Sequence, residues 1–404
     1  MKASILRALS GCRDELIEFA QDLIEIPTEN PPGRHYRECT QLIGDRLRAF
    51  GVDSRVIEVG GSKKGVFPRY CLLACYGPGE EKLYFHGHYD VVPASSESQF
   101  APVLIGNRLV GRGSSDMKGG IAAMIYAIRI LQMCDIRLRD AIGLRLVPDE
   151  ETGGEYGSLY LLKRGLLGKD ALGMLIPEPT GGRIWNASRG AVSMMVTVRG
   201  KMAHAALQYK GVNAFENMTI VADELLRLKS QVEKRRTNFN IEPETAKHSI
   251  LMLGGLCRGG TNFNIVPAEC SFTIERRINP EETLESEKQR IFDLFEHVRK
   301  KGIRLDYEVL QEGESAVASE RSKLAEALCT SVKTITGKRP GFQMCPGLLE
   351  TRFYAKRNIP SYAYGPGALS VAHGPREWVD VEKICRCAAV YALTAAQLLG
   401  VSER

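Results

Sequence analysis

Apolar positions recur along this chain with two different spacings. Between residues 14 and 25 they return every three or four residues, which predicts an amphipathic helix, and a second helix is predicted over 36–50. Beyond Gly51, short apolar runs alternate with a longer helical run. The predicted strands lie at 53–59, 70–76, 82–86 and 142–147, and the predicted helix lies at 117–133. This alternation is typical of an α/β sheet with helices on both faces.

The pattern changes near Gly181-Gly182. A strand, a helix, two strands and a second helix follow within roughly 115 residues, which is a plausible size for a small domain. These elements are predicted at 191–199, 213–229, 248–256, 268–276 and 281–300. Their order indicates a compact α+β unit.

After Gly302 the α/β pattern returns, with a strand over 303–309 and helices over 321–336 and 380–399. The central unit is therefore predicted to be an insertion. We predict an α/β fold in which 1–183 and 303–404 form one discontinuous domain, with a mixed sheet flanked by helices. Residues 184–302 would form the inserted α+β domain.

The length and composition narrow the class of protein. A chain of 404 residues is too long for one ordinary core, so two domains are expected. Hydrophobic residues make up 44% and charged residues 25%, as in globular proteins.

The eleven cysteines form no CxxC array, and this pattern favours reduced thiols in the cytoplasm. The net charge of +6 forms no basic stripe, so nucleic acid is not an expected partner. Arg7 and Arg13 interrupt the N-terminal segment and no run reaches ~20 apolar residues, so neither a signal peptide nor a membrane span is expected.

The stretch Phe85-His86-Gly87-His88-Tyr89-Asp90 continues a predicted strand. Because alternate side chains share a face of a strand, His86, His88 and Asp90 are expected to point the same way. A neutral imidazole binds a metal through one ring nitrogen while a carboxylate or carbonyl holds the other. His88 and Asp90 therefore suit a metal ligand and its orienting partner, and an ordinary polar strand end is the alternative.

Two acidic motifs follow strands or precede a helix. Asp116, in Gly111-Arg-Gly-Ser-Ser-Asp116, leads into the helix at 117, and a helix N-cap is its structural alternative. Gly119 and Gly120 weaken that helix's first turn, which makes sense if something must approach it closely. Glu150 and Glu151 follow an apolar strand, where adjacent side chains diverge and can face a metal and a substrate separately, although a solvated loop is the alternative.

Two more residues complete the candidate group. Glu178 is bracketed by prolines after a short strand, and His373 lies just ahead of the last helix; a turn acid and a loop histidine are the alternatives. All these side chains lie at the edge where α/β sheets bind ligands. Two imidazoles and three carboxylates suit two divalent ions, zinc first and then cobalt or manganese.

Five motifs, in this order, resemble peptidase family M20, whose members use two co-catalytic metal ions. The motifs are His88-Tyr-Asp90-Val-Val-Pro, Gly113-Ser-Ser-Asp116-Met-Lys-Gly-Gly, Glu150-Glu151-Thr-Gly-Gly, Pro177-Glu178-Pro-Thr and His373-Gly-Pro. The family includes acetylornithine deacetylase, succinyl-diaminopimelate desuccinylase, aminoacylase and glutamate carboxypeptidase. The match extends over nearly the whole chain and implies a catalytic domain with an inserted lid and dimerisation domain.

The resemblance implies a metal-binding role for five residues. Asp116 would bridge the two ions, and His88 and Glu178 would complete the ligands of one of them. Glu151 and His373 would complete the ligands of the other.

The resemblance also implies the remaining catalytic roles. Glu150 would be the general base, and Asp90 would orient His88. His204, in Gly200-Lys-Met-Ala-His204, is similar to the family histidine that reaches the partner subunit's site and stabilises the oxyanion. A homodimer is therefore implied.

Three residues are candidates for binding the substrate. Asn264 and Arg277 resemble family positions that hold the substrate's carboxylate or scissile carbonyl, and Arg352 is a third candidate. A guanidinium suits a carboxylate because its fork makes two parallel hydrogen bonds, and a surface ion pair is the alternative. Residues 205–209 and 347–352 depart from the family pattern on the substrate side, which leaves the acyl group open.

The expected activity is hydrolysis of an amide C–N bond next to a carboxylate, most simply in a small N-acyl amino acid. A dipeptidase or carboxypeptidase, and an aminohydrolase that releases ammonia, are alternatives with the same metal site. A non-catalytic binding protein is a third alternative. Glu150 argues against a binding protein, because a binder has no need of a base at that position.

Overall fold

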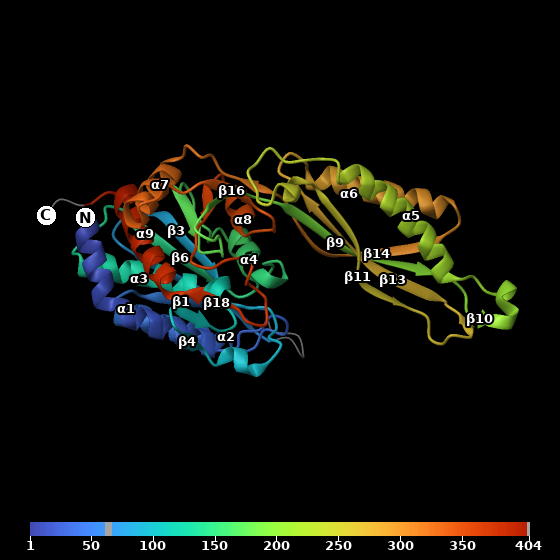
Figure 1. Ribbon diagram of the computed structural model, residues 1–404, viewed down its shortest axis with the longest axis horizontal. Coiled ribbons are helices and arrows are strands. Elements are labelled where there is room, and N and C mark those ends of the chain that lie inside the picture. Colours follow the sequence, from blue (N-terminus) through green and yellow to red (C-terminus); the bar gives the residue numbers. More distant parts are fainter. Residues whose placement is uncertain (61–66, 402–404) are drawn as a thin grey trace. The chain divides into compact units, whose positions relative to one another are not determined.

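The computed structural model describes residues 1–60 and 67–401 (Figure 1). The chain divides into two compact units. The first unit consists of Met1–Asn186, Ala318–Gln343 and Phe353–Arg404, and the second consists of Ala187–Val317 and Met344–Arg352. The first unit is thus discontinuous in sequence, which agrees with the predicted α/β fold with an insertion.

A mixed β-sheet forms the centre of the first unit. Its strands follow the order β1-β2-β6-β3-β7-β17-β8. β3 runs parallel to β6 and β7, and β17 runs parallel to β7, whereas β1–β2, β2–β6 and β17–β8 are antiparallel pairs. The strand bounds are β1 (Ser54–Val59), β2 (Arg69–Tyr76), β3 (Glu81–His88), β6 (Ala141–Val147), β7 (Gly173–Ile176), β8 (Ile184–Ser188) and β17 (Ser361–Ala363). β6 is buried along its whole length, so both of its faces are covered.

Four helices pack together over one face of this sheet. The ring of Phe85 in β3 lies 5.7 Å from the ring of Tyr391 in α9. A Cβ on Gly87 would lie 3.2 Å from Ile121 Cγ1, so α3 packs directly against the strand backbone. α1 packs against α3 and α9, and α7 packs against α9 (Figure 1). The bounds are α1 (Lys2–Glu25), α3 (Gly119–Met133), α7 (Lys323–Thr336) and α9 (Val381–Leu399).

Shorter helices lie on the opposite face. His86 points to this side of β3, and its two ring nitrogens each lie 3.0 Å from a hydroxyl oxygen, those of Ser158 and Tyr354. These hydroxyls belong to α4 (Ser158–Lys163) and α8 (Thr351–Ala355). His86 is therefore a buried packing residue with satisfied ring nitrogens. α2 (Tyr36–Ala49), which packs against β1 and β2, lies instead on the face of α1 and α3, where Arg46 Nη1 donates to Tyr126 Oη of α3 at 2.7 Å.

The second unit is a four-stranded antiparallel sheet, in the order β11-β13-β9-β14, with two helices. Alternate residues of β9, from Val192 to Val198, are buried in one core with apolar residues of α5 and α6, whereas the intervening residues are more exposed. A two-stranded ladder of β10 and β12 extends this unit. The bounds are β9 (Gly190–Arg199), β10 (Ala203–His204), α5 (Ala214–Val232), β11 (Ile250–Gly259), β12 (Ile265–Val266), β13 (Glu269–Ile278), α6 (Leu284–Lys300) and β14 (Arg304–Gly313).

The predicted domain boundaries differ from the observed ones. The strand predicted at 303–309 was assigned to the outer domain, but as β14 it pairs with β9 in the second unit, so the boundary expected at 302 lies at Val317. The start expected at 184 lies at Ala187. The sequence of a strand does not by itself predict which sheet the strand joins, because pairing depends on side chains far away in sequence.

Short elements connect the longer ones. β4 (Val103–Ile105), β5 (Arg108–Val110) and β18 (Trp378–Asp380) form a small sheet in the order β18-β5-β4. The others are β15 (Ala316–Val317), β16 (Phe342–Cys345), η1 (Glu97–Phe100), η2 (Ser114–Lys118), η3 (Glu150–Thr152), η4 (Ala205–Lys210) and η5 (Glu244–Lys247). Within 1–60 and 67–401, no helix has the length and apolar character needed to cross a bilayer.

Candidate metal centre

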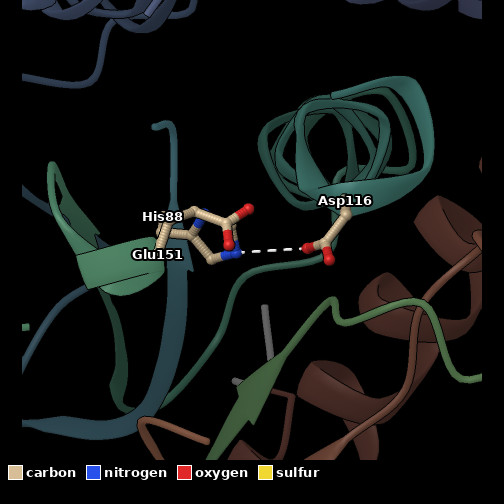
Figure 2. A group of neighbouring side chains, drawn as sticks. All are labelled: His88, Asp116 and Glu151. Carbon is tan, nitrogen blue, oxygen red and sulfur yellow. Dashed lines mark hydrogen bonds and ion pairs between the residues drawn. The ribbon is translucent and has the colours of Figure 1, made fainter. Parts of the chain in front are cut away.

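His88 occupies the last position of β3 and is buried. Its Nδ1 lies 3.0 Å from the backbone carbonyl oxygen of Asp90 and 3.4 Å from the Oδ1 of the same residue. Asp90 thus contacts His88 as predicted, with the carbonyl as the nearer acceptor. These contacts leave Nε2 facing the carboxylate of Asp116 at 3.2 Å (Figure 2).

The Asp90 carboxylate also anchors the turn that carries the two glutamates. The backbone N–H groups of Glu150 and Glu151 each donate to it at 3.2 Å. Asn30 donates from Nδ2 to the same carboxylate at 2.9 Å and to Thr152 Oγ1 at 2.8 Å. Asp90 therefore joins the end of β3 to η3. No sequence pattern pointed to Asn30, which lies in a proline-rich loop.

Asp116 is not a helix N-cap. It lies in η2, ahead of α3, and its carboxylate contacts two imidazoles instead of backbone N–H groups of the helix. Oδ1 lies 3.2 Å from His88 Nε2, and Oδ2 lies 3.4 Å from His373 Nε2. The structure thus brings two residues 285 positions apart in the sequence (88 and 373) to opposite oxygens of one carboxylate.

His373 and Glu151 complete the group. His373 Nε2 lies 3.1 Å from Glu151 Oε1. The ligand atoms of His88, Asp116 and Glu151 all lie within 4.8 Å of one another (Figure 2). His373 has a φ of 61°, a left-handed conformation that persists in non-glycine residues only where surrounding contacts fix it.

A buried ion pair fixes both His373 and Asp116. Arg112 Nη1 lies 2.7 Å from Glu377 Oε2, and Arg112 Nη2 donates to the carbonyl oxygen of His373 at 3.3 Å. Glu377 Oε1 accepts the backbone N–H groups of Ser115 and Asp116 at 2.9 and 3.0 Å. The pairing of β18 with β5 brings these segments together. Sequence reasoning missed this pair, although an acid four residues after His373 was a detectable signal.

Glu178 is buried directly after β7, outside the close group of three. Its neighbour Pro177 approaches the first turn of α3, since a Cβ on Gly120 would lie 2.4 Å from Pro177 Cβ. The sequence predicted a close approach at this glycine, and the structure shows that Pro177 makes it. This approach also brings the segment that carries Glu178 to the helix that follows Asp116.

The electrostatics of this group favour positive charge among the carboxylates. Burial opposes charging of His88, but hydrogen bonds to Asp116 and Asp90 raise its pKa well above the usual range. Hydrogen bonds to Asp116 and Glu151 raise the pKa of His373 to about 10. Burial raises the pKa of Glu151, whereas both imidazoles hold the pKa of Asp116 below its usual range against the opposing effect of burial. Protons on the imidazoles supply the charge that a divalent cation would supply at the same atoms, so the donor set fits a metal.

Two predicted residues meet at one end of the second unit. His204 is exposed in β10, where it pairs with Ile265, and its Nδ1 accepts the backbone N–H of Ala206 at 3.1 Å. The Asn264 carbonyl accepts the N–H of Ala205 at 2.9 Å. Among the described residues, Asn264 Oδ1 is buried and has no hydrogen-bond partner.

Two other predicted residues lie at the opposite end of the same sheet. Arg277 of β13 and Gly313 of β14 both pair with Ala191 of β9. Arg352 lies beside the same strand end, since a Cβ on Gly313 would lie 3.0 Å from Arg352 Nε. Arg277 is one-third exposed and paired with Glu275 at 2.6 Å. Arg352 is buried, and its Nη1 donates to the Leu349 carbonyl at 2.7 Å, a contact typical of a structural role.

A family model and a curated relative match this chain. The model of peptidase family M20/M25/M40 matches residues 84–397. A probable succinyl-diaminopimelate desuccinylase of Staphylococcus epidermidis is 26% identical over 394 residues, with 90% of this chain and 92% of that protein covered.

Solved structures share the fold. The di-peptidase Dug1p of Saccharomyces cerevisiae matches with a TM-score of 0.81 and 15% identity, over 98% of each chain. The YXEP protein of Bacillus subtilis, described as a dinuclear metal binding peptidase, matches with a TM-score of 0.66 and 15% identity, over 96% of this chain and 99% of that one.

Proposed function

The chain belongs to peptidase family M20/M25/M40 and is a hydrolase of amide bonds, and on this premise we propose that it removes the acyl group from a small N-acyl amino acid by means of two divalent ions. The observation that carries this proposal is the continuous set of contacts from His88 through Asp116 and His373 to Glu151. A buried group of this composition is stable only when cations lie among its carboxylates.

Five residues would hold the ions. Asp116 would bridge them, with His88 and Glu178 on one side and Glu151 and His373 on the other. Imidazole and carboxylate donors favour zinc, with cobalt or manganese as alternatives. When bound, the ions would polarise the scissile carbonyl and lower the pKa of the attacking water towards ~7.

Glu150 would act as the general base. Its backbone N–H is fixed by Asp90, while its partly buried side chain is close enough to His88 to raise the pKa of that imidazole. A carboxylate in this position can take a proton from the attacking water and transfer it to the leaving amine. Asp90 would then position Glu150 and Glu151 as well as His88.

The second unit would bind the substrate. We assign the carboxylate of the substrate to Arg277, with Arg352 supporting the adjacent loop, and the charge on the tetrahedral intermediate to His204 and Asn264. Arg277 pairs with Ala191 near the start of β9, and His204 lies beyond Arg199 at the end of β9. The eight steps from Ala191 to Arg199, at about 3.3 Å per residue, span roughly 26 Å. One small substrate cannot contact both ends within one chain. This separation supports a homodimer in which His204 acts on the partner subunit's substrate.

The identity of the acyl group is the most specific part of the proposal. The similarity to a probable succinyl-diaminopimelate desuccinylase supports an N-succinyl amino acid as substrate, and an N-acetyl amino acid is the alternative. Hydrolysis of a panel of N-acetyl, N-succinyl, dipeptide and ureido substrates by the zinc- and manganese-loaded protein discriminates the alternatives. Cleavage of dipeptides alone would replace deacylation with dipeptidase activity, and ammonia release would indicate an aminohydrolase.

The substitution Glu150→Ala tests the catalytic proposal itself. We expect turnover to fall by ~10²–10⁴-fold, the usual contribution of a general base, because no other group takes the proton. Metal content, measured by plasma emission spectroscopy, and the circular dichroism spectrum should stay near those of the parent protein. Retained turnover would remove Glu150 from the mechanism, and a parent protein without turnover on any substrate would support a binding function.

A further inference from the structure

We propose that the first unit carries a second ligand site, which binds a small anion with a diphosphate group. The site is a cavity of about 450 Å³ between the end of α7, the first two turns of α9 and three loops, 181–183, 338–340 and 364–366. This volume is within the range of small-molecule sites. The lining residues are Gly181, Gly182, Arg183, Val332, Thr336, Lys338, Arg339, Pro340, Tyr364, Gly365, Pro366, Lys383, Arg386 and Cys387. None of them belongs to the candidate metal centre.

The charge of the lining is the observation that points to an anion. Five of the lining residues are basic and none is acidic, although the whole chain has 54 basic and 48 acidic residues. The five basic residues are Arg183, Lys338, Arg339, Lys383 and Arg386. Five positive charges around one cavity nearly equal the net charge of +6 of the whole protein. Charges of one sign in a concave surface reinforce one another and concentrate counter-ions there.

Four of these side chains have no carboxylate partner in the part of the chain that the structure describes. Among residues 1–60 and 67–401, no salt bridge joins an acidic side chain to Lys338, Arg339, Lys383 or Arg386. The acidic neighbour of Lys383 on α9, Glu382, is paired with Arg13 instead, at 3.0 Å. These four basic groups therefore remain available to an external anion. A diphosphate carries enough charge to engage several of them, and arginine forks bind phosphate oxygens in pairs.

The cavity has one rigid wall. Tyr364 is buried, and its backbone N–H donates to the Ile176 carbonyl at 3.0 Å. Gly365 donates its N–H to Thr180 Oγ1 at 3.2 Å, and a Cβ there would lie 2.2 Å from the Pro177 carbonyl oxygen. Only glycine fits at this position. A wall fixed in this way gives a bound ligand a defined surface, whereas an exposed cluster of lysines would not.

Calorimetric titration of pyrophosphate into the full-length protein tests the site. Saturable binding is expected at 50 mM NaCl, with weaker binding at 200 mM because salt screens exposed charges. In the double variant Arg339→Ala/Arg386→Ala, Kd should rise about tenfold or more, since two charge-assisted contacts are lost. Both residues are exposed, so the melting temperature and the amide hydrolase activity should not change.

Two control variants distinguish this cavity from binding elsewhere on the protein. His88→Ala tests whether pyrophosphate binds at the metal centre, and Lys234→Ala/Lys300→Ala removes two exposed charges in the second unit. Binding that survives both controls but not the Arg339/Arg386 change supports the site. Loss of binding in His88→Ala, equal weakening in the lysine control, or no saturable binding at millimolar pyrophosphate would overturn it.

A parallel titration with ADP identifies the source of the diphosphate. A lower Kd for ADP than for pyrophosphate assigns the site to a nucleoside diphosphate, and the reverse assigns it to free diphosphate. Either result supports the site, provided that Arg339→Ala/Arg386→Ala weakens the binding.

Discussion

The candidate metal centre and the polar residues of the second unit are built in opposite ways. At the metal centre, side chains from four segments meet at 3.1–3.4 Å, and backbone N–H groups and a buried ion pair fix their positions. In the second unit, His204 and Asn264 lie at one end of a sheet and Arg277 lies at the other. His204 is exposed, and its side chain accepts a local hydrogen bond from the backbone N–H of Ala206.

This contrast indicates a division of labour. A reaction that depends on closely spaced charges needs ligands fixed to within a fraction of an ångström, and burial with interlocking hydrogen bonds provides this. Substrate recognition by residues far apart needs a second surface to bring them together. The four residues of the candidate metal centre thus meet within one unit, whereas the proposed substrate residues would form one site only in the proposed homodimer.

Removal of the shared carboxylate is expected to have the largest effect. Asp116→Ala should reduce hydrolysis to background, because His88 and His373 lose the group that lies between them. Emission spectroscopy should detect loss of both ions, with circular dichroism close to that of the parent. Asp53→Ala, which removes an exposed carboxylate of the same unit, is the control and should retain metal and activity. A full metal complement in Asp116→Ala would contradict the proposed bridging role.

Mixing two inactive variants tests directly whether His204 acts in the partner subunit's site. His204→Ala alone should lower kcat by ~10²–10³-fold, the usual cost of losing an oxyanion donor. In a hybrid dimer of His204→Ala with Glu150→Ala, one site receives an intact Glu150 and an intact His204 from different subunits. Random pairing should therefore restore about a quarter of the parent activity. No recovery, in mixtures that mass spectrometry shows to contain hybrids, would place His204 in its own subunit's site.

The positions of Asp116 and His373 should depend on Glu377. Glu377→Gln leaves the buried Arg112 guanidinium without its counter-charge, so metal affinity should fall ~10–100-fold, as for other residues that support metal ligands. Competition with a fluorescent chelator measures this affinity apart from turnover. Glu382→Gln is the matched control, since Glu382 of α9 forms a partly exposed pair with Arg13 of α1, and loss of this pair should leave the affinity unchanged. Loss of thermal stability with unaltered metal affinity would limit Glu377 to a structural role.

The sequence was sufficient to predict those parts of the molecule that depend on local patterns. Helical periodicity predicted α2 and α9 to within a residue or two, and the His88, Asp116, Glu151 and His373 motifs meet in the structure. These residues were identifiable because imidazoles and carboxylates beside strand and helix ends are chemically distinctive.

Other features depend on contacts that sequence does not encode locally. β14 looked like the start of the outer domain, yet it joins the second sheet through pairing with β9. Glu377 and Arg112 were not singled out from the sequence, because their buried ion pair becomes visible only when β18 lies beside β5. Arg352 was predicted to bind substrate, and that role stays a prediction; in the structure its side chain is buried and Nη1 donates to the Leu349 carbonyl.

The smallest expected effect concerns the other end of the second unit. Arg277→Lys keeps the positive charge but loses the guanidinium fork, so KM for a carboxylate-bearing substrate should rise about tenfold with little change in kcat. Arg304→Lys, an exposed position on β14, is the control and should leave both constants unchanged. Because Arg277 and His204 lie at opposite ends of β9, their substitutions should affect different constants, KM for Arg277 and kcat for His204. A fall in kcat alone in Arg277→Lys would mean that this arginine contacts the reacting group, and the two ends of the sheet would then share one role.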